Sequence, residues 1–492
     1  MQTVAFHNLG CKVNSYETEV MQQYFQKNGY SIVEFAQKAD IYVINTCTVT
    51  NIADRKSRQM IHKAKALNPD AVVIAVGCYV QTHAADIEGE DGIDLAIGNN
   101  KKGEIVAIVE QYLTEKKPRE GRREQGKTAA GEKTLQGATI PDLTDRPEYE
   151  ELNLSSTMEH TRVYLKIQDG CNQFCSYCAI PYARGRVRSR KAEHILEEAR
   201  RLAGKGYREI VLTGIHISSY GLDFYNESYN RVFAKVSEAD GNTDAGTTGE
   251  DRKMEQMGVC DYRHSGLFLA LVEQLAQVEG IERIRLGSFE PRIITEEFAK
   301  GLAAIKKVCP HFHLSLQSGC DSVLSRMNRQ YTCADFQESV AILRKYFEDP
   351  AITTDLIAGF PGETKEEHEE TLAFVEGIGF YETHIFPFSR RKGTAADKMP
   401  GQLTEKQKKE RCEDLRRIHE KNRKAYMDRF LGKPLPVLWE TTKQIEGKEC
   451  FVGHSPNYLE IALPVSKAGG EDLTGEITEA APRTNYGDGL MC

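Results

Sequence analysis

The stretch DGCNQFCSYCAIPYARG, residues 169–185, holds three closely spaced cysteines, Cys171, Cys175 and Cys178, and no fourth nearby. It directly follows RVYLKI, an apolar segment typical of a β-strand. Three thiolates suit an iron–sulfur cluster, zinc or copper(I). Because a structural zinc site normally closes with four protein ligands, zinc is the less favoured alternative. We expect a 4Fe–4S cluster whose fourth iron is open to a small molecule.

Length, composition and charge limit the class of protein. A chain of 492 residues suggests roughly three domains. No apolar run approaches the roughly 18 residues of a membrane span, and the start lacks a secretory signal, so a soluble cytoplasmic protein is expected. The 13 cysteines then favour metal binding or catalysis over disulfides. The net charge of −8 does not indicate a nucleic-acid binder, although local basic patches could still bind RNA.

The amino-terminal region, residues 1–113, alternates short apolar runs with amphipathic stretches. This pattern predicts an α/β domain with a flavodoxin-like parallel sheet. Residues 114–156 turn polar and predict a linker, basic at its start, for which a solvated tether is favoured over a specific RNA contact.

The region from 157 to 398 contains six candidate strands with helical stretches between them, which predicts a partial (βα)6 barrel. A polar insertion, 224–264, is expected to be a surface loop. A lysine- and arginine-rich connecting helix, 399–429, follows. Short strands and turns in 430–492 predict a small β-barrel.

A second set of cysteines lies in the amino-terminal region. Cys11, Cys47 and Cys78 each follow the carboxyl end of a different predicted strand, so a parallel sheet could bring them to one crevice. For any one of them alone, a buried structural cysteine is the favoured alternative. The other cysteines form no such pattern and are interpreted as structural or incidental: Cys260, Cys309, Cys320, Cys333, Cys412, Cys450 and Cys492.

The cysteine motifs resemble those of a known family. The CxxxCxxC segment after the first barrel strand resembles the signature of radical S-adenosylmethionine (SAM) enzymes. TDLIAGFPGET, residues 354–364, resembles their GxIxGxxGE motif, except that Asp355 stands at its first glycine. LGCKVNSYETE, NTCTVT and VGCY resemble the cysteine motifs of the methylthiotransferase amino-terminal domain. The whole chain is therefore similar to radical SAM methylthiotransferases.

This resemblance implies two 4Fe–4S clusters and SAM as cofactors. The auxiliary cluster would be held by Cys11, Cys47 and Cys78, and the cluster that exchanges with SAM by Cys171, Cys175 and Cys178. On the family's mechanism, SAM yields a radical at the second cluster and the auxiliary cluster carries the sulfur. No catalytic residue beyond these cysteines is expected. Candidate SAM contacts are Tyr177, Gly214, Gln317, Ser318, Arg329 and Ile357.

Several of these contacts have structural alternatives. Tyr177 could simply pack under its loop, Gln317 and Ser318 could be structural polar groups, and Arg329 an ordinary surface arginine. Glu290 is a weaker candidate for the same site. The basic run RGRVRSRK, 184–191, could contact tRNA phosphates or supply solvated charges at a helix start.

The resemblance also implies a substrate. The terminal region looks like a TRAM module for RNA contact, to which Tyr458 and Lys448 could contribute. The signature stretch and GHSPNYLEI are most similar to bacterial enzymes that methylthiolate carbon 2 of N6-threonylcarbamoyladenosine at tRNA position 37. Isopentenyladenosine enzymes usually carry an acidic residue where this chain has Asn172.

The expected partners are the tRNA anticodon loop and a reductase or flavodoxin-type electron donor. The alternatives are methylthiolation of isopentenyladenosine or of a ribosomal protein aspartate. A non-enzymatic, metal-stabilised RNA-binding protein is a remote alternative.

Overall fold

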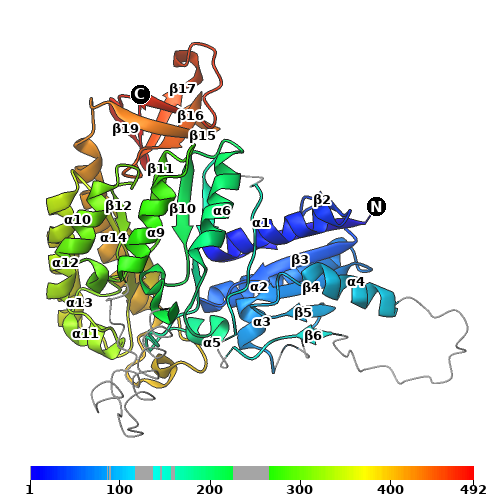
Figure 1. The fold of residues 1–492 in the computed structure, drawn as a ribbon. Helices are drawn as coiled ribbons and strands as arrows, with labels where there is room; N and C mark the ends of the chain where they lie inside the picture. The colour runs from blue at the N-terminus through cyan, green and yellow to red at the C-terminus, as the bar shows by residue number, and fades with distance from the viewer. Residues whose placement is uncertain are drawn as a thin grey trace, which may run out of the picture. The chain divides into compact units, whose positions relative to one another are not determined.

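The computed structural model divides into two compact units, which are described separately (Figure 1). The first unit contains Met1–Ser155, Asp169–Cys171 and Cys178–Arg188, and the second contains Ser156–Gln168, Asn172–Tyr177 and Ser189–Cys492. The described residues are 2–85, 87, 90–116, 137–143, 147–156, 161–224 and 265–492. The basic part of the expected linker, nearly all of the expected insertion, and Cys260 lie outside these residues.

The first unit is built on a six-stranded parallel sheet of order β2-β1-β3-β4-β5-β6. Its strands are β1 (Thr3–Asn8), β2 (Ser31–Val33), β3 (Ile41–Thr46), β4 (Val72–Gly77), β5 (Leu95–Ile97) and β6 (Ala138–Thr139). Its longer helices are α1 (Lys12–Lys27), α2 (Asn51–Leu67) and α4 (Ile105–Lys116), and the short helix α3 (Cys78–Thr82) follows β4 directly. Two apolar clusters form its core, one with side chains of α1 and α4 and the other with side chains of α2 and α3. The predicted parallel-sheet domain is confirmed.

Part of the expected linker belongs to this sheet. The segment supplies β6, and Leu143, Leu152 and Leu154 are buried. The Tyr16 hydroxyl donates a 2.5 Å hydrogen bond to the carbonyl oxygen of Leu152. A few well-placed leucines fix the segment, although its average composition is polar.

The second unit contains all six predicted barrel strands, in two three-stranded parallel sheets of order β11-β10-β7 and β12-β13-β14. A parallel bridge between Phe289 and Leu314 links the segments that follow β11 and β12. The strands are β7 (Val163–Lys166), β10 (Glu209–Thr213), β11 (Arg283–Leu286), β12 (His311–His313), β13 (Ala351–Ala358) and β14 (Glu382–Pro387). The main helices between them are α6 (Ala192–Ala203), α9 (Ser265–Ala276), α10 (Glu296–Ala304), α12 (Cys333–Tyr346) and α13 (Lys365–Ile378).

The predicted connecting helix is α14 (Glu405–Asp428), which begins with a capping box between Thr404 and Gln407. A curled six-stranded mixed sheet follows, a half-barrel that agrees with the small β-barrel module expected, with the order β18-β15-β16-β17-β20-β19. Its strands are β15 (Leu435–Ile445), β16 (Lys448–His454), β17 (Glu460–Pro464), β18 (Ile477–Ala480), β19 (Thr484–Tyr486) and β20 (Gly489–Met491). A Cβ atom on Gly453 would lie 2.1 Å from the Leu438 carbonyl oxygen, so β15 and β16 approach too closely there for any other residue.

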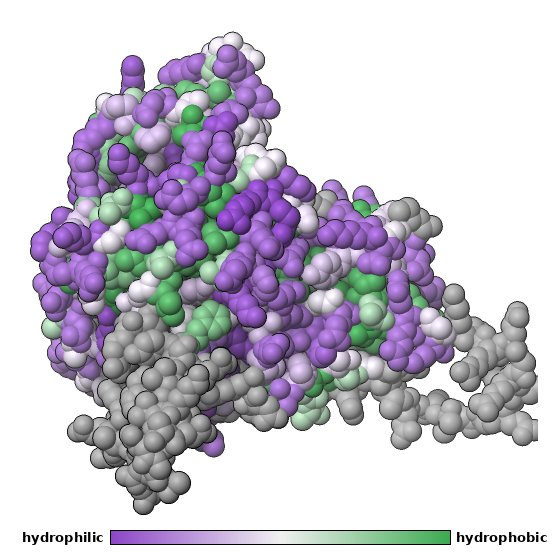
Figure 2. All heavy atoms as spheres, viewed as in Figure 1, coloured by the Kyte–Doolittle hydropathy of each residue, from purple (hydrophilic) through white to green (hydrophobic). Residues whose placement is uncertain are grey.

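Hydrophilic residues predominate on the face drawn in Figure 2. Within the described parts of the chain, no helix combines the length and the apolar composition that crossing a membrane requires.

Candidate cluster and cofactor site

The three cysteines of the first unit follow neighbouring strands. Cys11, Cys47 and Cys78 come after β1, β3 and β4, and β3 pairs in parallel with both of the others. The chain before Cys11 runs against Cys47, because a Cβ atom on Gly10 would lie 3.0 Å from the Cys47 Sγ atom. The topology therefore brings the cysteines to one edge of the sheet, as the strand pattern predicts.

The surroundings of Cys47 favour its protonated thiol when no metal is bound. Burial, together with the nearby Cys78 and Cys11, raises the pKa of Cys47 to about 12. The Cys47 thiol is therefore protonated at neutral pH until a metal displaces the proton. Three sulfur donors at one edge are a donor set that fits a 4Fe–4S cluster.

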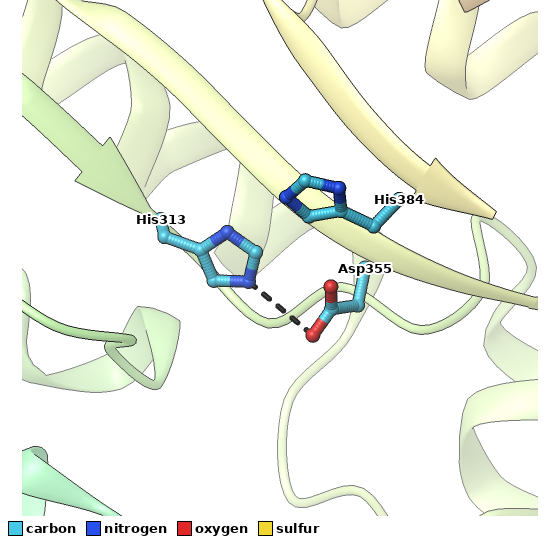
Figure 3. A group of neighbouring side chains, drawn as sticks. All are labelled: His313, Asp355 and His384. Atoms are coloured by element: carbon cyan, nitrogen blue, oxygen red, sulfur yellow. Dashed lines mark ion pairs between the residues drawn. The ribbon is translucent and has the colours of Figure 1, made fainter. Parts of the chain in front are cut away.

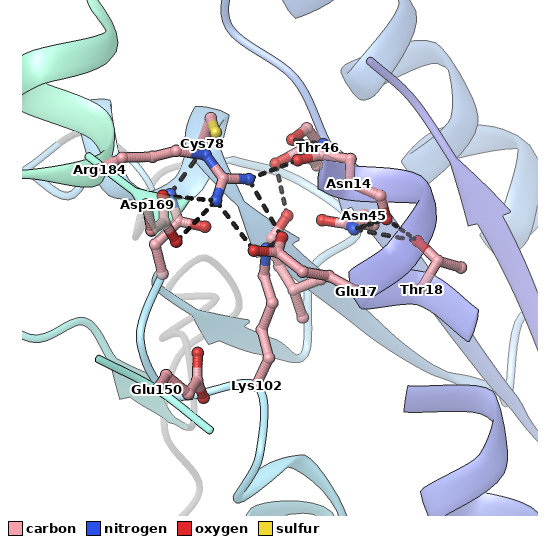
Figure 4. Close-up of polar contacts among 12 residues, drawn as sticks. Asn14, Glu17, Thr18, Asn45, Thr46, Cys78, Lys102, Glu150, Asp169 and Arg184 are labelled. Carbon is pink, nitrogen blue, oxygen red and sulfur yellow. Dashed lines mark hydrogen bonds and ion pairs between the residues drawn. The ribbon is translucent and has the colours of Figure 1, made fainter. Parts of the chain in front are cut away.

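A buried ion network lies in the same unit (Figure 4). Arg184 donates hydrogen bonds to Glu17 at 2.9 Å, to Asp169 at 3.1 Å and to Asn14 at 2.6 Å. The ammonium group of Lys102 pairs with the same Glu17. Glu17 belongs to the helix after the first auxiliary cysteine, and Asp169 stands two residues before Cys171. The network therefore ties together the segments that carry two cysteines of different motifs.

The basic run at 184–191 is largely buried. Arg184 and Arg190 are 0% exposed and Arg188 is 4% exposed. Arg190 pairs with Glu198 at 2.7 Å. The hypothesis that this run contacts tRNA phosphates is therefore wrong for these three arginines, because they sit among buried carboxylates. Arg186 is exposed.

The glycine before the barrel cysteines is sterically required. Gly170 has a φ of +72°, and a Cβ atom there would lie 1.9 Å from the Arg186 carbonyl oxygen. Beside it, the Cys171 amide donates a 3.1 Å hydrogen bond to the Gly185 carbonyl. Any side chain at this position would displace the start of the cysteine loop.

The middle of the cysteine loop is anchored within the second unit. The Ser176 amide donates to the Met327 carbonyl at 3.0 Å, and the Ser176 hydroxyl donates to the Arg326 carbonyl at 2.8 Å. Arg329 is directed to the loop and lies 3.2 Å from the Cys175 Sγ atom. The guanidinium group therefore places a positive charge beside a sulfur atom that is predicted to bind the cluster. Arg329 is thus an inward cation beside the cluster loop rather than a surface arginine.

Two of the predicted SAM contacts, Tyr177 and Ile357, share one apolar environment. Tyr177 and Ile357 both pack against a cluster that includes Phe360. The rings of Tyr177 and Phe360 meet edge to face, with their centroids 6.5 Å apart. At Gly214, a Cβ atom would lie 2.9 Å from the Gln168 side-chain oxygen, so a larger residue there would require the Gln168 side chain to move.

Gln317 and Ser318 have well-defined structural contacts. Gln317 has a φ of +72°, and its amide donates to the Asp355 carbonyl while its own carbonyl accepts from the Ile357 amide. The Ser318 hydroxyl lies 3.3 Å from the Thr371 hydroxyl. Their role as SAM contacts stays a prediction.

A polar group around Glu290 also faces the cysteine loop. Its carboxylate accepts hydrogen bonds from Gln173 at 2.8 Å and from Arg292 at 2.5 Å, and the His216 Nε2 atom lies 3.6 Å away. Burial alone would raise the pKa of Glu290, but His216 and Arg292 hold it below its usual value. Sequence reasoning missed His216, although it belongs to the glycine-motif stretch LTGIHISSYG.

The terminal sheet leaves no free ring face for RNA at Tyr458. This ring stacks on both His311 and His454, with centroids 4.6 Å apart in each case. The Arg285 guanidinium lies 4.7 Å from the same ring. Its ring is therefore already engaged inside the protein, whereas Lys448 is exposed. A contribution of either residue to RNA contact stays a prediction.

Comparison with known proteins agrees with this geometry. The model of Uncharacterized protein family UPF0004 matches residues 3–98, and that of the Radical SAM superfamily matches residues 165–375. The second match implies a 4Fe–4S cluster and SAM.

Relatives match over almost the whole chain. Threonylcarbamoyladenosine tRNA methylthiotransferase MtaB of Bacillus subtilis is 38% identical over 97% of this chain and 93% of its own. The protein of the same name from Aquifex aeolicus is 36% identical over 88% and 92%. The tRNA-2-methylthio-N(6)-dimethylallyladenosine synthase of Moorella thermoacetica is 31% identical over 95% and 93%. The chain belongs to the radical SAM methylthiotransferase family.

Proposed function

We propose that this enzyme methylthiolates carbon 2 of N6-threonylcarbamoyladenosine at position 37 of tRNA. The observation that carries the proposal is the 38% identity, over 97% of the chain, to a relative named for that substrate. The synthase named for dimethylallyladenosine reaches 31%. Asn172, which stands where enzymes of that second class usually carry an acidic residue, supports the same choice.

The proposal includes a second 4Fe–4S cluster on Cys11, Cys47 and Cys78. When bound, the two clusters and SAM supply the radical and the sulfur that an unactivated aromatic carbon requires. The protein binds and orients these groups. Three cysteines at each site leave one iron without a protein ligand. Arg329 places a cation beside Cys175, and the Arg184 network holds the segments that carry Cys11 and Cys171.

Exposed apolar side chains near the cysteines support a substrate-facing surface in the first unit. Val49 and Ile52, which follow Cys47, are each 53% exposed, and Tyr182, which follows Cys178, is 59% exposed. Unstacked RNA bases bind aromatic and apolar surfaces of this kind. We therefore include the tRNA anticodon loop as partner, together with a reductase or flavodoxin-type electron donor.

The test uses purified, cluster-loaded enzyme with SAM and a chemical reductant. Transcripts that carry threonylcarbamoyladenosine or isopentenyladenosine, and the ribosomal protein with its target aspartate, are supplied in separate reactions. Mass spectrometry should find the methylthio group on threonylcarbamoyladenosine. Product formed only on isopentenyladenosine or on the ribosomal protein would overturn the proposal.

A further inference from the structure

Three side chains that are not among the six predicted cluster cysteines converge in the second unit. His313 ends β12, Asp355 lies in β13 and His384 lies in β14 (Figure 3). Candidate ligand atoms of the three residues all lie within 4.8 Å of one another. Asp355 pairs directly with His384 across the strands, and His313 pairs with Thr353, two residues before Asp355 on the same face. Strand register therefore fixes the convergence.

The separation of the first two ligand atoms fits a metal ion. His313 Nε2 and Asp355 Oδ2 are 3.3 Å apart. Two ligand atoms about 2.1 Å from one ion and separated by this distance subtend roughly 105° at it, close to the tetrahedral angle. The other ring nitrogen of His313, Nδ1, lies 3.0 Å from the buried Thr353 hydroxyl. A contact of this kind holds a ligand ring in orientation with Nε2 toward the ion.

The ion pair between His313 and Asp355 does not account for the position of His384. Its ring stacks on His313 with the centroids 5.8 Å apart and the planes inclined by 26°. Among the contacts of the described residues, the nitrogens of His384 have no hydrogen-bond or ion-pair partner. A pair formed by His313 and Asp355 alone gives no reason for this third side chain to converge. The side chains of His313 and Asp355 are 14% and 34% exposed, so an ion can reach them.

We propose that His313, Asp355 and His384 bind one divalent first-row transition-metal ion such as Zn²⁺. Two imidazoles and one carboxylate are a donor set that such ions prefer. Three protein ligands leave at least one coordination position for water or for an oxygen donor such as a carboxylate. This ion would be additional to both clusters, and the proposal does not depend on which nucleoside is the substrate.

The test measures zinc directly. Cluster-loaded protein is dialysed anaerobically against buffered free Zn²⁺, and zinc and iron per chain are measured by mass spectrometry. The wild type should bind one more zinc per chain than the double variant His313→Ala/His384→Ala, with equal iron. Asp355→Asn should weaken this zinc binding at least about tenfold. Thiols elsewhere bind zinc equally in all these proteins, so the difference isolates the site.

His62→Ala, which removes an exposed histidine of the first unit, is the matched control and should bind zinc like the wild type. Because the His384 side chain is exposed, the single variant His384→Ala should fold even if the double variant does not. It should also bind zinc at least about tenfold more weakly. Equal zinc binding by the wild type and His384→Ala overturns the proposal, whatever happens to activity.

Discussion

The buried arginine of the first unit allows a quantitative test of the ion network. In Arg184→Met, an unbranched apolar side chain replaces a guanidinium that is 0% exposed. Glu17 keeps Lys102 as a partner, whereas Asp169 loses its 3.1 Å contact and keeps only the longer pair with Arg188 at 3.8 Å. Breaking a buried pair by removing one partner costs about 3–5 kcal/mol, since the other charge stays buried. We expect the first unit to lose that much stability.

The assay is hydrogen exchange of α1 in metal-free, reduced protein. A loss of 3–5 kcal/mol corresponds to roughly 160- to 4,700-fold faster exchange of amides that exchange through unfolding of this unit. Trp439, the chain's single tryptophan, is buried in the terminal sheet, and its fluorescence provides an internal reference for the second unit. Its unfolding midpoint should not change.

The matched control is Arg186→Met, which removes an exposed arginine two residues away. We expect it to change stability by about 0.5 kcal/mol or less. If Arg184→Met accelerated the exchange of α1 less than about tenfold, or no more than the control does, the reasoning from the buried network would be refuted.

Three further predictions concern other parts of the chain. Gly170→Ala should lower the iron content by about half, because its Cβ atom would lie 1.9 Å from a backbone oxygen. The control Gly206→Ala, at a glycine with φ +92° and open space around it, should keep both clusters, and equal iron in the two variants would contradict this prediction. Cys175→Ala should abolish reductive cleavage of SAM and Cys47→Ala should spare it while blocking product, with Cys492→Ala as control; retained cleavage in Cys175→Ala would remove the proposed role of the barrel cysteines. Burial raises the pKa of Glu209, but Arg285 and the neighbouring arginines lower it to about 2, so Glu209 contributes about 3 kcal/mol to the free energy of unfolding above the unfolded pKa of 4.5 and loses this contribution as the pH falls toward 2. The difference in urea midpoint between wild type and Glu209→Gln, followed by Trp439 fluorescence, should shrink over that pH range. A constant difference would count against this account.

The sequence predicted the parts of the fold that depend on local patterns. Alternating apolar and amphipathic segments identified the strands of the first unit and of the barrel, because the periodicity of strands and helices depends only on residues close together in the sequence. The cysteines of the first unit were predictable for the same reason. Each follows a recognisable strand, and parallel strands end at one edge of the sheet.

The sequence did not predict contacts between distant side chains. Arg184 looked like part of a phosphate-binding run, because its partner Glu17 lies 167 positions earlier. The His313, Asp355 and His384 group depends on the register of three strands, which composition does not encode. In the expected linker, a polar average concealed the few leucines that bury against the first unit.

The central claim is that this enzyme adds the methylthio group to threonylcarbamoyladenosine in tRNA. The most direct measurement is mass spectrometry of tRNA nucleosides from cells that lack the protein and from cells complemented with wild type or with Cys47→Ala. We predict that cells without the protein, and those with Cys47→Ala, accumulate threonylcarbamoyladenosine without its methylthio form, which wild type restores. Loss of the methylthio form of isopentenyladenosine instead, or no change in either nucleoside, would contradict the claim.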